Sequence, residues 1–260
     1  MKKPILLLLS LIVVITAFVS SCKKEYSASG TLKPPVEDSF NLTVNFTPMV
    51  DTLKLHFDST YRNFWKESYS ISSFKFYTSK FDLINTDSNR TYHLNTNKYF
   101  LIDAGDSTTW TVHLPATPFT YNRISFLIGI DSLRNVSGLD TGSLDPKKGM
   151  YISATGGFIM AELEGKSASG KSLSYEISGF SGDYNVLRTP TLLFPYNNFL
   201  QITPGRKSVI NIEADANAWF SNPHQIKIDD IPTCTTPGLQ AKDISENYSK
   251  MFTVDTVINN

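Results

Sequence analysis

The chain alternates apolar and polar residues from about residue 40 onward. Segment 40–46, Phe-Asn-Leu-Thr-Val-Asn-Phe, is apolar at every second position, which is typical of a strand with one solvated face. Similar strand patterns recur at 53–57, 110–114, 124–130, 173–177 and 209–212. Turn-forming residues separate these runs. The pattern predicts an all-β fold, an antiparallel β-sandwich, in a single domain over residues 39–260.

A short helix is predicted near the end of the domain. Ile244, Tyr248 and either Met251 or Phe252 recur at the spacing of one helix face. Asp243 stands just before this face and can act as the N-cap. The expected architecture is therefore a sandwich with one C-terminal helix.

The first residues have the features of a bacterial export signal. Lys2 and Lys3 precede an apolar run over 5–19, which is shorter than the roughly 20 residues that span a bilayer. Small residues follow and lead to Cys22, so that the segment Val-Ser-Ser-Cys matches a lipobox. The sequence predicts a lipoprotein signal peptide over 1–21, lipidation of Cys22, and a polar, proline-containing tether over 22–38. The alternative is an ordinary secretory signal that happens to contain a cysteine.

Lipidation of Cys22 would make the membrane a permanent partner of this chain, because two or more acyl chains hold a protein on a bilayer almost irreversibly. Lys23 follows the lipidated residue, where a signal for retention in the inner membrane would place Asp. We therefore expect the outer membrane of a Gram-negative cell. The sequence leaves open whether the domain faces the periplasm or the outside.

Composition excludes several classes of function. The 260 residues carry 24 basic and 24 acidic side chains, so no net field attracts nucleic acid. Two cysteines are too few for a disulfide scaffold or a cysteine-built metal centre, and Cys234 is expected to be a free, structural thiol. Recognisable catalytic motifs are missing, and Glu162 with Glu164 is interpreted as the exposed face of a strand. We therefore expect a binding protein and not an enzyme.

Several ordered motifs resemble one known family. They are IGIDSLRN (128–135), LDPKKGMY (144–151), GGFIMAELEG (156–165), a strand-pair segment (74–83), YHL (92–94) and NYSKMF (247–252). Together they resemble the signature of MbnP-like proteins over most of 40–252. The resemblance implies an exported all-β protein. It further implies copper binding, an oxidised tryptophan and a partner related to di-haem peroxidases.

The chain departs from the family pattern at the positions that copper chemistry would need most. Family tryptophans are replaced by Ile152 and Ala154, and family histidines by Pro48 and Glu176. Copper prefers imidazole and sulfur ligands, so the resemblance predicts an inherited fold with an incomplete inherited metal site. The candidate ligands that remain are His93, His113, His56 and Met150.

The long irregular stretch 128–151 is a second candidate site. Loops of this length in a compact domain are usually functional or packed as their own unit. Asp131, Asn135 and Asp145 could supply oxygen ligands, although their spacing does not match an EF-hand. Turn formation is the simpler role for these residues.

A surface lipoprotein that binds a glycan or a protein without metal is the alternative function. Aromatic residues could form stacking platforms for such a partner. The residues considered for this role are Tyr61, Trp65, Trp219 and Phe220.

Overall fold

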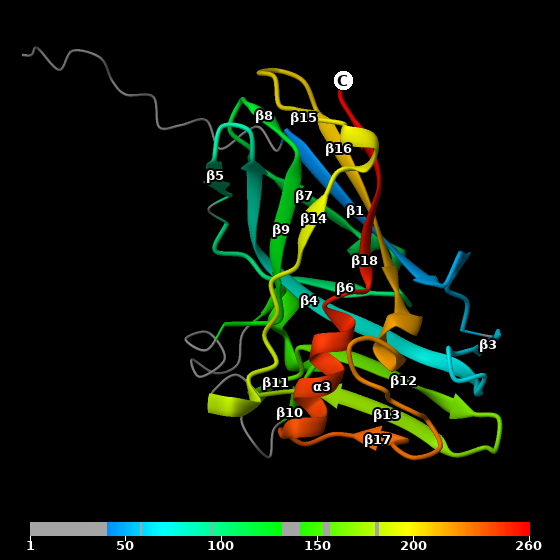
Figure 1. Cartoon of the computed structure of the whole chain (residues 1–260). Helices are drawn as coiled ribbons and strands as arrows, with labels where there is room; N and C mark the ends of the chain where they lie inside the picture. The colour runs from blue at the N-terminus through cyan, green and yellow to red at the C-terminus, as the bar shows by residue number, and fades with distance from the viewer. Residues whose placement is uncertain (1–40, 58, 95, 132–140, 153–156, 180–181) are drawn as a thin grey trace, which may run out of the picture. The chain divides into compact units, whose positions relative to one another are not determined.

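The computed structural model describes residues 41–260 except 58, 95, 132–140, 153–156 and 180–181. All of them belong to one compact unit, 39–260. Figure 1 shows two main sheets and a helix near the C-terminus. The described residues are mostly in strands, which confirms the predicted all-β, sandwich-like fold with one short C-terminal helix.

The first sheet is built around β1, whose inward-facing residues are the apolar positions of the alternating sequence. Residues at the even positions Leu42, Val44 and Phe46 are fully buried, and those between them are half-buried. The strand order is β18-β16-β1-β2, with β7 also paired to β1. These strands are β1 (Leu42–Val50), β2 (Leu53–Lys54), β7 (Thr111–Leu114), β16 (Ser208–Asp215) and β18 (Phe252–Ile258).

The second sheet is built around one long strand, β4. Its order is β14-β9-β4-β12-β13-β17, and β3, β5 and β6 also pair with β4. These strands are β3 (Thr60–Arg62), β4 (Ser68–Asn85), β5 (Arg90–His93), β6 (Phe100–Asp103), β9 (Arg123–Ile128), β12 (Ala161–Ser167), β13 (Ser172–Ile177), β14 (Thr191–Leu193) and β17 (Thr233–Cys234). The segment 74–83 is thus part of one continuous strand and not a pair of strands.

Smaller elements lie between the strands of the two sheets along the chain. Two short pairs are formed by β8 (Thr120–Tyr121) with β15 (Leu200–Gln201) and by β10 (Tyr151–Ile152) with β11 (Gly157–Phe158). The single turns are η1 (Ser107–Thr109), η2 (Gly142–Leu144), η3 (Pro146–Lys148), η4 (Gly182–Tyr184), η5 (Pro195–Asn197) and η6 (Ala216–Phe220). The α-helix is α3 (Leu239–Tyr248).

Aromatic rings fill the space between the sheets. Phe46 and Phe252 come from the first sheet, and Phe76 and Phe126 come from the second. The ring of Phe252 lies 5.0 Å from that of Phe126 and 5.3 Å from that of Phe76, both in edge-to-face geometry. Such pairs stabilise a core beyond the area that they bury.

Two further features of the fold differ from the sequence-based expectation. Most strand pairs are antiparallel, but β1 runs parallel to β16 and β13 runs parallel to β17, so both sheets are mixed. The helix α3 begins after Gly238, which places Asp243 inside the helix and not at its N-cap. Ile244 and Tyr248 form its buried face as predicted, whereas Phe252 opens β18.

One glycine permits the two central strands of the second sheet to approach closely. Gly165 lies at a bulge between β12 and β4, and a Cβ atom there would fall 1.9 Å from the Ser70 carbonyl oxygen. No side chain fits at that distance. The glycine therefore holds β12, and with it the carboxylates of Glu162 and Glu164, against β4.

Candidate functional site

The four ligands predicted from the sequence lie in separate places. His93, on β5, bonds through Nδ1 to Asp82 at 2.7 Å, and His113, on β7, lies 3.2 Å from the Thr43 hydroxyl. His56 is exposed in the turn after β2, and Met150 is buried between η3 and β10. None of these histidines belongs to a group of three or more His, Cys, Asp or Glu that could share one ion within the described part of the chain.

The loop residues that the sequence proposed as oxygen ligands have local roles. Asp131 accepts a hydrogen bond of 2.5 Å from the Tyr99 hydroxyl and forms an ion pair with Lys80. Asp145 caps η3 by accepting from the backbone N–H of Lys147. Asn135 lies outside the described residues.

A different set of side chains does converge. His224 follows η6 in a loop, and Asp243 and Glu246 stand three residues apart on α3, so that they share one helix face. Buried Asn247 ties the loop to the helix. Its side-chain oxygen accepts from the His224 N–H at 2.8 Å, and its amide donates to the His224 carbonyl at 2.8 Å. The backbone of the histidine is thereby fixed relative to the two carboxylates.

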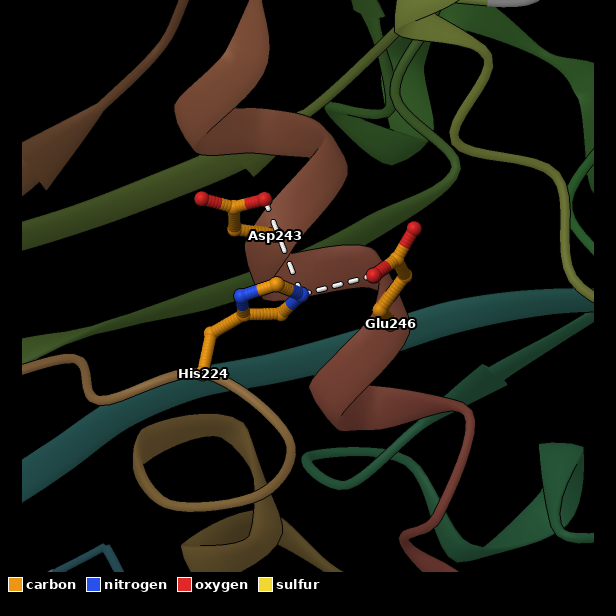
Figure 2. Close-up of side chains that lie close together, drawn as sticks. All are labelled: His224, Asp243 and Glu246. Atoms are coloured by element: carbon orange, nitrogen blue, oxygen red, sulfur yellow. Dashed lines mark hydrogen bonds and ion pairs between the residues drawn. The ribbon is translucent and has the colours of Figure 1, made fainter.

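Figure 2 shows the three side chains directed toward one another. The Nε2 atom of His224 lies 2.6 Å from the Glu246 Oε2 and 3.6 Å from the Asp243 Oδ1. The three ligand atoms lie within 4.8 Å of one another, and all three side chains are half-buried. This is the sole group of its kind found in the described residues.

The other oxygen of Glu246 faces two cations. Lys242 contacts its Oε1 at 2.7 Å, and Arg188 contacts the same atom at 3.5 Å. The hydrogen bonds from Lys242 and His224 lower the pKa of Glu246 to about 2, since both stabilise the ionised form. The carboxylate is therefore ionised at neutral pH, and its Oε2 is the oxygen that faces His224.

The geometry suits a divalent transition metal. In a tetrahedral zinc site with ligand bonds near 2 Å, neighbouring ligand atoms lie about 3.3 Å apart. The separation of 3.6 Å between Nε2 and the Asp243 oxygen is close to this value. The 2.6 Å contact with Glu246 would have to widen by several tenths of an ångström as an ion replaces the shared hydrogen. One imidazole and two carboxylates would leave a fourth position open.

The sequence contained one signal for this group. Asp243 and Glu246 have the i, i+3 spacing of a shared helix face, but Asp243 was interpreted as a cap. His224 was not among the ligands chosen from the sequence. Its partners are 19 and 22 residues away, so their convergence depends on how the loop folds against α3.

Comparisons with known proteins agree with the motifs. The MbnP family model matches residues 39–236, which is most of the chain. The chain belongs to the MbnP family. A solved structure, MbnP from Methylosinus trichosporium, is similar at 12% identity and a TM-score of 0.46, covering 74% of this chain and 82% of that one. A search of curated proteins finds no match.

The candidate group lies partly outside the MbnP match. His224 falls within the matched residues, whereas Asp243 and Glu246 come after residue 236. Of the altered family positions, Pro48 lies in β1, Ile152 in β10 and Glu176 in β13. Ala154 lies outside the described residues. The group His224–Asp243–Glu246 is therefore built from positions other than those where this MbnP domain departs from the family signature.

Glu176 belongs to a row of three carboxylates on the second sheet. It stands directly opposite Glu162 on β12, and Glu164 follows on the same face. Glu162 is only 5% exposed, which corrects the expectation that this strand face is solvated. Glu162 contacts Lys75 at 3.3 Å and accepts from the Ser73 hydroxyl at 2.5 Å.

Burial raises the pKa of both other carboxyls in this row. Desolvation is the main cause for Glu164 and for Glu176, and the neighbouring charge of Glu162 adds to it. The row lacks an imidazole. Its three carboxylates also do not form a group whose ligand atoms all lie within 4.8 Å of one another. The row is therefore a weaker metal candidate than the group on α3.

The aromatic residues considered as stacking platforms are mostly structural. Tyr61, Trp219 and Phe220 are buried in the core. Trp65 is partly buried and donates its indole N–H to the Phe220 carbonyl at 2.7 Å. The neighbour of Trp65, Phe64, is 73% exposed and was not selected from the sequence.

A cavity of about 330 Å³ lies next to the Arg188 side chain. Its lining includes Thr189, Thr191, Ser249 and Lys250. The guanidinium of Arg188 donates to the carbonyls of Asn185, Leu187 and Lys242 in addition to its contact with Glu246. Since Arg188 is already engaged by the protein, it holds the loop before β14 against α3 and does not offer a ready anion site.

The predicted signal peptide, the lipidation site Cys22 and the predicted tether all lie outside the described residues. Within the part of the chain that the structure describes, no helix has both the length and the apolar character needed to cross a lipid bilayer. Cys234 is buried, and burial raises the pKa of its thiol to about 11, as expected for a structural cysteine.

Proposed function

We propose that this chain is a lipid-anchored, exported metal-binding protein of the MbnP family that is not itself an enzyme. The observation that carries the metal half of the proposal is the convergence of His224, Asp243 and Glu246 on one point. Membership of a family associated with copper supports the same conclusion. The protein would hold or deliver an ion and leave any redox chemistry to a partner.

The donor set favours Cu(II) or Zn(II) over Cu(I). Cu(I) prefers sulfur and several imidazoles, whereas one imidazole with two carboxylates suits a harder divalent ion. His224 must bind through a neutral Nε2, so the affinity should rise with pH. Lys242 and Arg188 neutralise part of the negative charge at Glu246, which favours a modest affinity suited to transfer.

Metal analysis tests this half of the proposal. The purified full-length protein is titrated with Cu(II) and with Zn(II), and bound metal is counted after gel filtration. We expect one equivalent of metal to bind. His224→Ala should weaken binding by at least about 10–100-fold, the loss that even supporting groups of a metal site cause.

His93→Ala is the matched control. His93 also pairs with a carboxylate, that of Asp82, but it is exposed and has no second acid in a three-ligand group of described residues. Its loss should leave the affinity unchanged. Failure of the wild-type protein to bind stoichiometric metal, or an equal loss in both variants, would contradict the site.

The anchoring half rests on Cys22 and its lipobox. We expect Cys22 to carry acyl chains and the protein to fractionate with the outer membrane. Labelling with radioactive palmitate tests the first point, and Cys22→Ala should abolish both the label and the membrane fractionation. Recovery of unmodified Cys22 in the cytosol would contradict it.

A di-haem peroxidase-like protein is the partner that the family suggests. Affinity capture of the anchored protein from its own host, followed by haem staining, tests this expectation. A haem protein retained by the wild type and by His93→Ala would support it.

A metal-free binding function is the second candidate, and the exposure of Phe64 favours it. Phe64 packs edge-on against Trp65 at 5.1 Å, and Lys227 lies over the Trp65 ring at 5.8 Å. Such a group can stack against a sugar or a protein side chain. A glycan array on which Phe64→Ala loses binding while His224→Ala keeps it would favour this function.

A further inference from the structure

Half of the large hydrophobic side chains that the described residues expose lie at one end of the domain. Leu193 and Tyr196 come from the β14–η5 segment, Phe199 precedes β15, and Ile258 ends β18. η5 packs against β18, and Asn259 donates to the Phe199 carbonyl at 2.8 Å. We refer to Leu193, Tyr196, Phe199 and Ile258 as the apical patch.

Tyr196 has no evident role in the fold. Its side chain is 93% exposed, and its backbone is left-handed, with φ of 55° and ψ of 29°. A left-handed backbone is unfavourable for a tyrosine and is usually given to glycine or asparagine. A strained residue that presents an aromatic ring to solvent indicates a function outside the fold.

The apical patch lies where the predicted tether enters the domain. Asn41, the first described residue, accepts from the Ser208 N–H at 2.9 Å, and the Ser208 hydroxyl donates to the Gln201 carbonyl at 3.1 Å. Gln201 in turn donates to the Asn259 side chain at 2.8 Å. Figure 1 shows the start of β1, the β8–β15 pair and the C-terminus at the same end of the molecule.

The chain outside the described residues is short enough to keep this end near a bilayer. The predicted tether, residues 22–38, would span about 20–25 Å between the lipid on Cys22 and the domain. A surface tethered at this distance meets the membrane at a high effective concentration. The opposite end of the domain, with α3, would be held away from it.

The surroundings of the patch also suit a lipid headgroup region. The turn between β15 and β16 exposes Arg206 and Lys207 beside the apical patch. Tyr, Phe and aliphatic side chains next to cations are typical of residues that rest in the membrane interface, where cations meet anionic headgroups.

We propose that the apical patch rests in the interface of the membrane that carries the anchor and so orients the domain, with the His224 group facing away from the bilayer. This proposal rests on the proposed lipidation of Cys22. The occupant to which it commits is a lipid surface that contains anionic lipid. A second copy of the chain or another protein on the patch is an outcome that would overturn it.

The test uses the full-length lipoprotein in vesicles of phosphatidylethanolamine and phosphatidylglycerol that contain a doxyl-labelled quencher lipid. Tyr196→Trp places a reporter in the patch. Tyr184→Trp is the matched control, because Tyr184 is also an exposed aromatic residue but lies in η4, which packs against α3. We expect the emission added at 196 to be quenched roughly twofold or more, and the emission added at 184 to be unaffected.

Two further measurements separate the possible failures. Reversing the charges of Arg206 and Lys207 to Glu in the Tyr196→Trp protein should reduce the quenching, and high salt should remove that difference. Flotation of the wild type and of Cys22→Ala reports anchoring alone. If the wild type floats but the reporter at 196 is quenched no more than the one at 184, the patch proposal is overturned and anchoring stands.

The remaining outcomes of these experiments also test the proposal. If the wild type does not float, the anchoring is wrong and the patch proposal fails with it. If Tyr196→Asn changes the oligomeric state of the detergent-solubilised protein on gel filtration, and the reporter at 196 stays unquenched, the patch is a protein interface and not a membrane contact.

Discussion

Two groups of carboxylates in this molecule meet opposite surroundings. Glu246 on α3 is half-buried and lies within reach of His224, Lys242 and Arg188, and its pKa falls to about 2. Glu164 and Glu176, beside buried Glu162, have raised pKa values because burial and like charge penalise their ionised forms. The same residue type is thus ready to bind a cation in one place and resists ionisation in the other.

The difference lies in which groups the fold places opposite the acids. On α3, Lys242 lies one turn before Glu246 on the same helix. His224 and Arg188 reach Glu246 from loops outside the helix. On β12 and β13, a period of two puts three acids on one sheet face, and Lys75 contacts one of them, Glu162. The two groups of carboxylates therefore differ in the side chains that lie near them. This difference makes one a candidate metal site and leaves the other a row of carboxyls that resist ionisation.

The largest expected effect is the loss of that one cation. Lys75→Met leaves Glu162, which is 5% exposed, with the Ser73 hydroxyl as its one remaining side-chain partner among the described residues. We expect a loss of about 3 kcal/mol in the free energy of unfolding, as for an uncompensated buried charge. Urea unfolding at pH 7 measures it.

The matched variant on the other group is Lys242→Met. Glu246 keeps His224 and Arg188 and is better solvated, so the expected loss is about 0.5 kcal/mol. Adding Glu162→Met to Lys75→Met should recover most of the stability. Similar losses in the two single variants would erase the contrast between the groups.

Metal affinity is the next property in which the two groups of carboxylates should differ. Glu246→Gln removes the charged oxygen nearest to His224, and we expect an affinity loss of about 10–100-fold for Zn(II) or Cu(II). Glu176→Gln should leave the affinity unchanged, although the family resemblance predicts a histidine at position 176. Isothermal titration at pH 7 measures both variants. A larger loss in Glu176→Gln would move the metal site to the carboxylate row.

The sequence predicted those features that local pattern determines. Alternation identified β1 and β13, because every second side chain of each strand enters the core. It could not predict that β1 pairs in parallel with β16, since the partners Leu42 and Ser208 are far apart in the chain and the pattern carries no direction. The helix was predicted from Ile244 and Tyr248, but its N-cap was misplaced because Gly238 provides no side-chain cap.

The candidate site was less accessible to sequence reasoning. The three histidines that were chosen by strand position and motif, His56, His93 and His113, are all exposed and lie in separate places. His224 was assigned no role, because the sequence does not show the two hydrogen bonds between His224 and Asn247 that hold its loop against α3. Burial of Glu162 was missed for a related reason: the segment that covers a strand face cannot be identified from the strand alone.

Both the raised pKa values in the carboxylate row and the lowered pKa of Glu246 should affect how stability depends on pH. Because the pKa values of Glu164 and Glu176 are raised, these groups favour the folded state when protonated, and stability falls as pH rises above about 4.5. Asp215, whose pKa burial raises to about 6, adds to this slope. The lowered pKa of Glu246 acts oppositely: its contribution is present above about 4.5 and is lost as pH falls toward 2.

Melting temperatures from pH 2 to 8 test these signs. Glu176→Gln should flatten the decline above pH 4.5 and leave the acid side unchanged, whereas Glu246→Gln should flatten only the acid side. Both effects should be smaller than that of Lys75→Met, since the titrating groups are partly solvated. A Glu176→Gln protein with an unchanged slope would show that the row is not desolvated.

The smallest effect is expected at Asp243, and it distinguishes a metal ligand from an ion-pair residue. Its oxygen lies 3.6 Å from His224, too far for a strong bond, so Asp243→Asn should change the metal-free stability by at most about 0.5 kcal/mol. The rise in melting temperature on adding Zn(II) should nevertheless shrink, because a ligand that binds more weakly stabilises the folded state less. An equal rise in wild type and variant would mean that Asp243 only completes a charge network, and that α3, like β12, carries its acids for reasons of structure.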